Sequence, residues 1–172
     1  MHIRRALCFA FLVPFLFLFG CSSSGPVKPE SLQLTIDSTA EIRTDGERFD
    51  CRICHDRSGR TEIRYTDPGG VLDGLCFLRK NGESVFRYGD LEHRILPGSL
   101  PGTHLPEKIA AVLDQAQAWE TLKAEGDCLS GRLPDGTPFR IYAERNGTIT
   151  RLLIDNIGEV SFHNTDSKVS ME

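Results

Sequence analysis

The most distinctive chemical pattern in the chain is the run Cys51-Arg52-Ile53-Cys54-His55. A C-x-x-C-H run attaches c-type haem through two thioether bonds and supplies an axial histidine ligand. Covalent haem normally lies at a helical turn of a small α-rich domain, whereas this run falls inside an alternating, strand-like segment. A c-type haem protein is therefore the least favoured of three functional hypotheses. Strand cysteines beside an incidental histidine explain the run better.

The same residues fit two other chemistries poorly. A redox pair needs a lowered thiolate pKa at a helix N-terminus, and no helical pattern follows Cys54. On a strand, residues three apart point to opposite faces, so Cys51 and Cys54 would not bridge each other. A disulfide from Cys51 or Cys54 to Cys76 or Cys128 is more plausible than one between Cys51 and Cys54. Zinc would need a second C-x-x-C or an H-x-x-x-H, which the chain lacks, so we expect no metal and no cofactor.

The chain lacks the motifs of the common enzyme classes. It contains no G-x-S-x-G, no H-E-x-x-H and no phosphate-binding glycine loop. Its 20 basic and 24 acidic residues give a formal net charge of −4, without a basic footprint for nucleic acid. We predict a protein that is not an enzyme, has no catalytic residues and does not bind nucleic acid.

The N-terminus has the layout of an export signal. An apolar stretch over residues 6–19 follows two arginines, and it is shorter than the ~20 residues that span a bilayer. The tetrad Leu18-Phe19-Gly20-Cys21 resembles the bacterial lipobox, in which the cysteine sulfur receives a diacylglyceryl group. We predict a signal peptide over 1–20, lipidation at Cys21 and a flexible tether over 21–30. The chain is then held by its lipid on the extracytoplasmic side of a cell membrane or outer membrane.

The remaining ~150 residues are enough for one domain with one core. Short segments in which apolar and polar residues alternate are separated by turn signals, as in antiparallel strands with one buried face. Asn81-Gly82 marks the clearest hairpin, because this pair takes the positive φ angles of a type I′ turn. Residues 165–172 are polar and are predicted to be a disordered tail. The expected strands cover residues 32–36, 49–53, 61–65, 75–79, 85–88, 91–96, 128–133, 139–144, 149–155 and 159–163.

One helix interrupts these strands. Pro106 suits a helix start, and apolar residues then recur at three- and four-residue spacing up to residue 119. The stripe predicts a helix that lies across the concave face of the sheet, with Trp119 closing one end. Its members are Ile109, Val112, Leu113 and Ala116.

Several turn and strand segments together resemble LolA-like lipoproteins. They are Tyr65-Thr66-Asp67-Pro68, Leu72-Asp73-Gly74-Leu75, Tyr88-Gly89-Asp90-Leu91 and the closing Val160-Ser161-Phe162. That family includes outer-membrane lipoprotein carriers and receptors, sporulation-associated lipoproteins and many uncharacterised bacterial lipoproteins. The resemblance implies an α+β domain over 31–164. Its antiparallel sheet would curve strongly into an incomplete barrel, and one or two helices would cover it. In the carriers the enclosed apolar cavity takes acyl chains.

These observations lead to a main hypothesis and an alternative. The main hypothesis is a monomeric, membrane-anchored, non-enzymatic module that binds a lipid, a lipoprotein acyl chain or another apolar envelope component. The alternative is a structural or interaction lipoprotein of the envelope or spore that has no ligand. Alternation along the strands and helix predicts the residues that line the groove: Ile53, Phe77, Phe86, Ile109, Trp119 and Ile141.

Overall fold

The computed structural model describes residues 27–96 and 104–163. The predicted signal peptide, Cys21, most of the tether and the tail over 165–172 lie outside the described residues. Among residues 27–96 and 104–163, no helix has the length and hydropathy needed to cross a bilayer.

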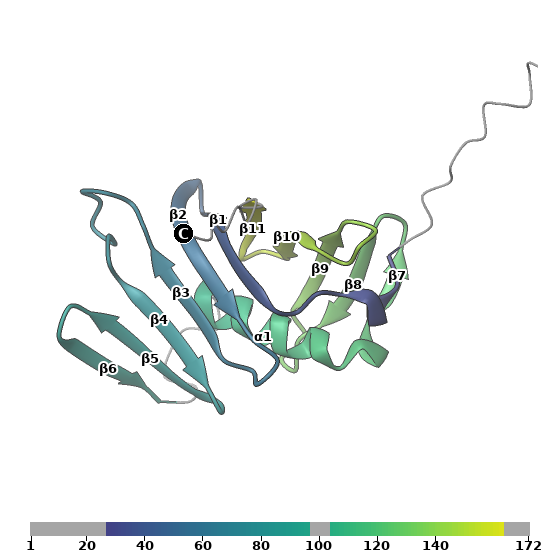
Figure 1. The fold of residues 1–172 in the computed structure, drawn as a ribbon, viewed down its shortest axis with the longest axis horizontal. Coiled ribbons are helices and arrows are strands. Elements are labelled where there is room, and N and C mark those ends of the chain that lie inside the picture. The colour runs from purple at the N-terminus through teal and green to yellow at the C-terminus, as the bar shows by residue number, and fades with distance from the viewer. Residues whose placement is uncertain (1–26, 97–103, 164–172) are drawn as a thin grey trace, which may run out of the picture.

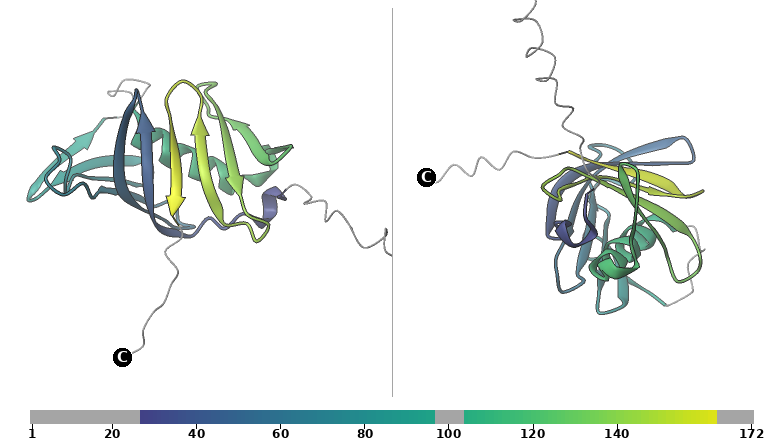
Figure 2. Two further views of the ribbon diagram at one scale, coloured as in Figure 1. Left: turned by 90° about the horizontal axis from the view of Figure 1, so that it is seen from above. Right: turned by 90° about the vertical axis from the view of Figure 1, so that its right-hand side faces the viewer.

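The described residues form one antiparallel sheet of eleven strands with a single α-helix (Figure 1). The strand order is β6-β5-β4-β3-β2-β1-β11-β10-β9-β8-β7, so the first and last strands of the chain meet in the middle. The sheet curves strongly and stays open, because β6 and β7 lie at its two ends without pairing with each other (Figure 2). The predicted curved, incomplete barrel is confirmed.

The strands mostly follow the predicted segments. They are β1 (Ile36–Thr44), β2 (Glu47–His55), β3 (Thr61–Tyr65), β4 (Cys76–Lys80), β5 (Glu83–Tyr88), β6 (Leu91–Ile95), β7 (Lys123–Glu125), β8 (Cys128–Arg132), β9 (Pro138–Ala143), β10 (Ile149–Ile154) and β11 (Gly158–His163). The Asn81-Gly82 hairpin is confirmed, since both residues have positive φ, 52° and 79°. The strand β7 was not predicted. All three of its residues are exposed, so its sequence lacks the alternation of apolar and polar residues that marks a strand with one buried face.

The helix α1 (Leu105–Gln117) lies on the concave side of the sheet (Figures 1 and 2). All four residues of the predicted stripe are at most 1% exposed, which confirms the face that the helix buries. Pro106 lies in the first turn, where its missing N–H leaves no intrahelical bond unmade. The core beneath the helix is formed by apolar residues of both halves of the sheet, including Ile53, Phe77, Ile141 and Leu152.

The predicted position of Trp119 was wrong. The helix ends at Gln117, and a 3-10 turn, η3 (Trp119–Thr121), follows. In a continued helix Trp119 would extend the buried stripe, because it lies three residues after Ala116. The tighter turn instead directs the indole outward, where it is 46% exposed, while Leu122 takes the buried place at 7%.

The N-terminal segment also differs from its predicted strand. Residues 29–31 form a short 3-10 turn, η2 (Pro29–Ser31), and β1 begins only at Ile36. Between them Gln33 forms an isolated bridge to Thr148, and its N–H donates to the carbonyl of Gly147 at 2.9 Å. The backbone hydrogen bonds of this segment are made to the β9–β10 turn rather than to a neighbouring strand.

Candidate functional site

A pocket with both apolar and polar lining residues opens where the N-terminus of α1 meets the β1–β2 hairpin. We name it the hairpin pocket; its volume is about 280 Å³. Ile42 and Phe49 face each other across β1 and β2, so alternation directs both side chains to the concave side. Its lining residues are Ile42, Thr44, Asp45, Phe49, Tyr65, His104, Leu105 and Pro106.

Two aromatic rings form one wall of the hairpin pocket. The rings of Phe49 and Tyr65 meet edge to face, with centroids 6.0 Å apart. Tyr65 is 7% exposed, and its burial, with a smaller contribution from Cys51, raises the pKa of its phenol to about 12. The phenol of Tyr65 is therefore neutral at physiological pH. The ring of Phe49 is half-buried at the pocket surface.

His104 places a polar atom in this apolar setting. It is the N-cap of α1, and its ring lies 5.1 Å from the ring of Phe86. Its Nδ1 is buried and has no hydrogen-bond partner among the described residues. Burial lowers the pKa of His104, against the opposite influence of Glu107, so the ring is held in its neutral form. A neutral imidazole nitrogen can donate or accept one hydrogen bond from a ligand.

A second hollow adjoins the first and shares Phe49 with it. This outer pocket has a volume of about 580 Å³ and lies between the β1–β2 hairpin and the loop after β3. Its apolar members include Leu72 and Val71, whose side chain is 96% exposed. Charged residues at its edge are Glu47, Arg48 and Asp67.

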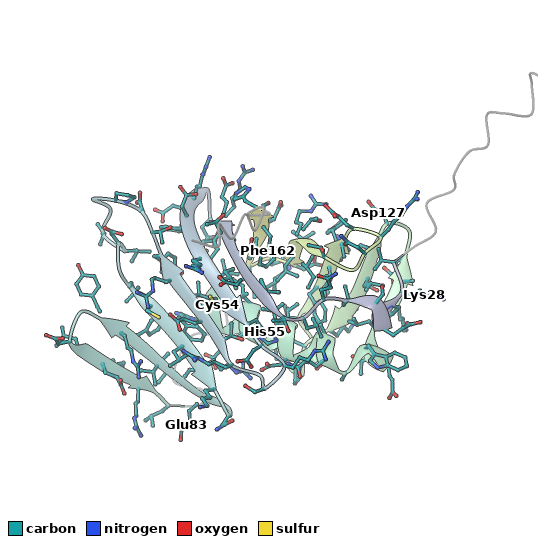
Figure 3. The ribbon with its side chains drawn as sticks, in the orientation of Figure 1. Lys28, Cys54, His55, Glu83, Asp127 and Phe162 are labelled. Atoms are coloured by element: carbon teal, nitrogen blue, oxygen red, sulfur yellow. The ribbon has the colours of Figure 1, made fainter. Side chains whose placement is uncertain are left out.

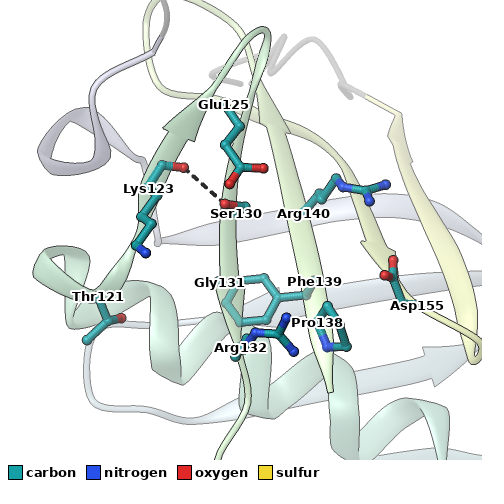
Figure 4. Close-up of a pocket in the computed structure, with 10 residues that line it drawn as sticks. All are labelled: Thr121, Lys123, Glu125, Ser130, Gly131, Arg132, Pro138, Phe139, Arg140 and Asp155. Atoms are coloured by element: carbon teal, nitrogen blue, oxygen red, sulfur yellow. Dashed lines mark hydrogen bonds between the residues drawn. The ribbon is translucent and has the colours of Figure 1, made fainter. Parts of the chain in front are cut away.

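A third pocket lies at the opposite end of the sheet, on β7, β8 and β9 (Figure 4). Its volume is about 520 Å³, and charged side chains of both signs line it: Lys123, Glu125, Arg132, Arg140 and Asp155. We call it the charged pocket. Because its walls are largely polar, it suits an apolar ligand less well than the hairpin pocket does.

The predicted groove residues do not line these pockets. Ile53, Phe77, Ile109 and Ile141 are all 0% exposed and pack in the core, while Phe86 is half-buried against His104. Trp119 lies on the surface instead of closing a groove. That these six residues contact a ligand stays a prediction.

The C-x-x-C-H run lies on β2 and its side chains alternate between the two faces, as the sequence predicted. Cys51 is 1% exposed on the core side, whereas Cys54 lies on the outer face, with its Sγ 3.3 Å from Oδ1 of Asp37 (Figure 3). Two thioether bonds to one haem would need both sulfurs on one side, so this geometry does not fit haem attachment. The sequence left open whether Cys51, Cys54, Cys76 and Cys128 form disulfides, and in the structure all four are free thiols. No group of three potential metal ligands occurs among the described residues.

His55 is a buried polar residue of the core. It is 2% exposed, and its Nδ1 lies 2.8 Å from the hydroxyl of Thr61. The side-chain amide of Gln117 donates to Nε2 at 3.2 Å, so the ring proton lies on Nδ1 and is donated to Thr61. Desolvation lowers the pKa of His55, while Asp114 and Asp56 act in the opposite direction. The neutral ring links β2, β3 and α1.

Protonation of His55 gives the first prediction. Its folded pKa is below its unfolded value of ~6.5, so the unfolded chain binds the proton first as pH falls. We expect the free energy of unfolding to decrease below about pH 6.5, by up to ~1.4 kcal/mol per pH unit for one proton. Asp114 acts oppositely at lower pH, since burial raises its carboxyl pKa.

The test is urea unfolding at pH 7.5 and 5.5. A His55→Asn variant keeps a polar atom near Thr61 but cannot titrate, and it should show a smaller loss between the two pH values than the unmodified chain. The exposed His163→Gln variant is the control and should keep the full loss. If the His55 variant and the unmodified chain lost the same free energy of unfolding between pH 7.5 and 5.5, the loss could not be assigned to His55.

Comparison with known proteins gives a likeness of fold. No family model matches the chain, and no curated protein matches it. One similar solved structure is a LolA superfamily protein from Nitrosomonas europaea, 13% identical, covering 80% of this chain and 69% of that one, with a TM-score of 0.34. Another is LprF from Mycobacterium bovis, 15% identical, covering 86% and 98%, with a TM-score of 0.32. The described residues themselves form the curved, open antiparallel sheet with one helix that the sequence predicted.

Proposed function

We propose that this chain is a non-enzymatic binding module of the bacterial envelope, held on the extracytoplasmic side by a lipid on Cys21. Its ligand is an apolar group, such as a lipid acyl chain, and its binding site is the hairpin pocket with the adjoining outer pocket. The observation that carries the proposal is the pocket wall of Ile42, Phe49, Tyr65 and Leu105 beside His104, whose Nδ1 has no hydrogen-bond partner among residues 27–96 and 104–163.

The pocket chemistry favours a chain-like ligand with one polar end. Each methylene removed from water contributes about 0.8 kcal/mol, and the two pockets are near the size range of small-ligand sites. A buried polar atom without a partner costs ~1–3 kcal/mol, which a hydrogen bond from the ligand to His104 would offset. Arg48 at the edge of the outer pocket is exposed and pairs with Glu41 at 2.7 Å, so a carboxylate or phosphate head group would have to compete with Glu41 for its guanidinium.

No catalytic centre is part of the proposal. Among the described residues, the histidine–hydroxyl pair that resembles a base and nucleophile is His55 with Thr61, and both are buried in the core at 2% and 0% exposed. A substrate could not reach either group without unfolding the sheet beneath α1.

A second candidate is an envelope protein without a ligand. It is favoured by the dense core under the helix, where Ile109, Val112 and Leu113 are fully buried against the sheet. In this case the hairpin pocket would be a surface irregularity, and the same fold would serve contacts with other envelope proteins.

Binding of a fluorescent sixteen-carbon fatty acid to the purified, unlipidated chain tests the proposal. We expect Phe49→Ala to weaken the affinity about 10-fold, since ~1.4 kcal/mol of apolar contact is lost. Trp119→Ala is the control, because it also removes an aromatic ring from the protein but lies outside the hairpin and outer pockets.

The two variants separate the candidate functions. Loss of affinity in Trp119→Ala alone would favour the groove predicted from the sequence, whereas absence of binding in the unmodified chain would favour the protein without a ligand. Urea unfolding of each variant distinguishes a loss of affinity from a loss of stability.

A further inference from the structure

The strand β6 is an edge of the sheet, and among the described residues no strand pairs with its outer side (Figures 1 and 2). Edge strands carry unpaired N–H and C=O groups that can pair with another chain. Four of its five residues are exposed, and the fifth, Ile95, is 8% exposed. Among the described residues, this edge is therefore exposed from Leu91 to Arg94.

The β5–β6 turn determines which peptide groups face outward. Tyr88 and Leu91 flank a two-residue loop and pair with each other, as in a hairpin closed by a hydrogen-bonded pair. Because hydrogen-bonded and non-bonded pairs alternate, His93 and Ile95 also bond inward to β5. The N–H and C=O groups of Glu92 and Arg94 then point out of the sheet.

We propose that β6 pairs antiparallel with β6 of a second copy of this chain. Backbone hydrogen bonds between the two copies can form only between residues whose N–H and C=O groups point outward, which here are Glu92 and Arg94. These two residues can be paired across the interface in three registers. Two of them place Glu92 opposite Glu92 or Arg94 opposite Arg94, and like charges directly opposite are destabilising. The third places Glu92 of each copy opposite Arg94 of the other, and a two-fold axis passes between the two His93 residues.

The charges around β6 favour this third register. Arg94 is exposed and has no acidic partner among the described residues, while Glu92 accepts from Arg87 at 3.0 Å on the same face. In the dimer each Glu92 would lie between Arg87 of its own chain and Arg94 of the other copy. On the concave face the same register sets Leu91, 74% exposed, opposite Ile95 of the second copy.

The interface is a single short strand, so the dimer is weak in dilute solution. Attachment of both copies to one membrane raises their effective concentration and favours pairing there. The inference replaces the expectation of a monomer and is independent of ligand binding in the hairpin pocket.

Disulfide crosslinking of the full chain in membranes of the producing cell tests the register. In the proposed pairing the two His93 residues form a non-bonded pair with Cα atoms ~4.5 Å apart, a distance that a disulfide spans. We expect His93→Cys to form a crosslinked dimer, at least 10-fold more than Glu92→Cys, Arg94→Cys or the unmodified chain. Stronger crosslinking of Glu92→Cys or Arg94→Cys, or a monomer in all variants, overturns the proposal.

Charge reversal in the His93→Cys background tests the ion pairs. Arg94→Glu alone and Glu92→Arg alone should each lower crosslinking about 10-fold, because each creates two like-charge contacts across the axis. Mixing the two variants should restore it, since their heterodimer again pairs opposite charges. Arg145→Glu is the matched control, an exposed arginine on the distant β9–β10 turn. An equal effect of Arg94→Glu and Arg145→Glu, or no recovery on mixing, overturns the assigned register.

Discussion

A chain that ends after Lys123 is expected not to fold. It would lack most of β7 and all of β8 to β11. The strand β1 would lose its partner β11, with which it forms five residue pairs, from Thr39–His163 to Arg43–Glu159. Ala40 and Ile42, buried at the centre of the sheet, would then lie at an open edge. The helix would also lose half of the apolar surface on which it packs, and the loss should exceed the 5–15 kcal/mol by which a domain is stable.

Circular dichroism during urea unfolding is the measurement, and no cooperative transition is expected from the truncated chain. The control is a chain that ends after His163, which keeps every described strand and should unfold like the unmodified protein. A truncated chain that remained soluble and unfolded cooperatively would show that residues 31–164 contain two domains instead of one.

Replacement of Leu113 by Ala should strongly reduce the stability of the domain. The side chain is 0% exposed, and it lines none of the three pockets described above. We expect the free energy of unfolding to fall by about 2–5 kcal/mol, because transfer energy is lost and a cavity remains. Ile109→Ala should act similarly, whereas Gln115→Ala, on the partly exposed face, should cost well under half as much.

Unfolding in the presence of the fluorescent fatty acid distinguishes two interpretations of the helix. If α1 is a fixed part of the core, Leu113→Ala and Ile109→Ala should each lower the free energy of unfolding by the same amount with and without the fatty acid. If the helix is a lid over ligand space, the loss should be nearer 1 kcal/mol and the affinity should fall more than the stability. The full burial of Ile109 and Leu113 favours the first outcome.

Much of the fold follows from local patterns in the sequence. Alternation of Cys51, Ile53 and His55 with polar neighbours predicts the buried face of β2, and glycine-containing turns predict where most strands end. The same alternation would have placed His55 in the core, although the C-x-x-C-H motif directed attention to its possible ligands. Trp119 and β7 could not be predicted, because the end of α1 and a short exposed strand leave no periodic signal.

Local sequence patterns could not predict the residues of the candidate site. Phe49, Tyr65 and His104 come from β2, the end of β3 and the residue before α1, and they meet only because the strand register brings these ends to one rim. Most of the predicted groove residues were chosen because alternation predicted their burial, and four of the six, Ile53, Phe77, Ile109 and Ile141, are fully buried in the core. A ligand site needs apolar residues left partly uncovered, and uncovered apolar residues at strand ends do not repeat with any period.

The meeting of β1 and β11 at the centre of the sheet has a consequence for biosynthesis. The strands β1 to β6 form successive hairpins that can pair soon after they are made, but the two halves join only when the last strand emerges. Until then β1 lacks one neighbour and α1 lacks half of its packing surface. A chain of this design cannot complete its fold while its C-terminus is still on the ribosome, so the stable domain forms only after synthesis of the last strand has ended.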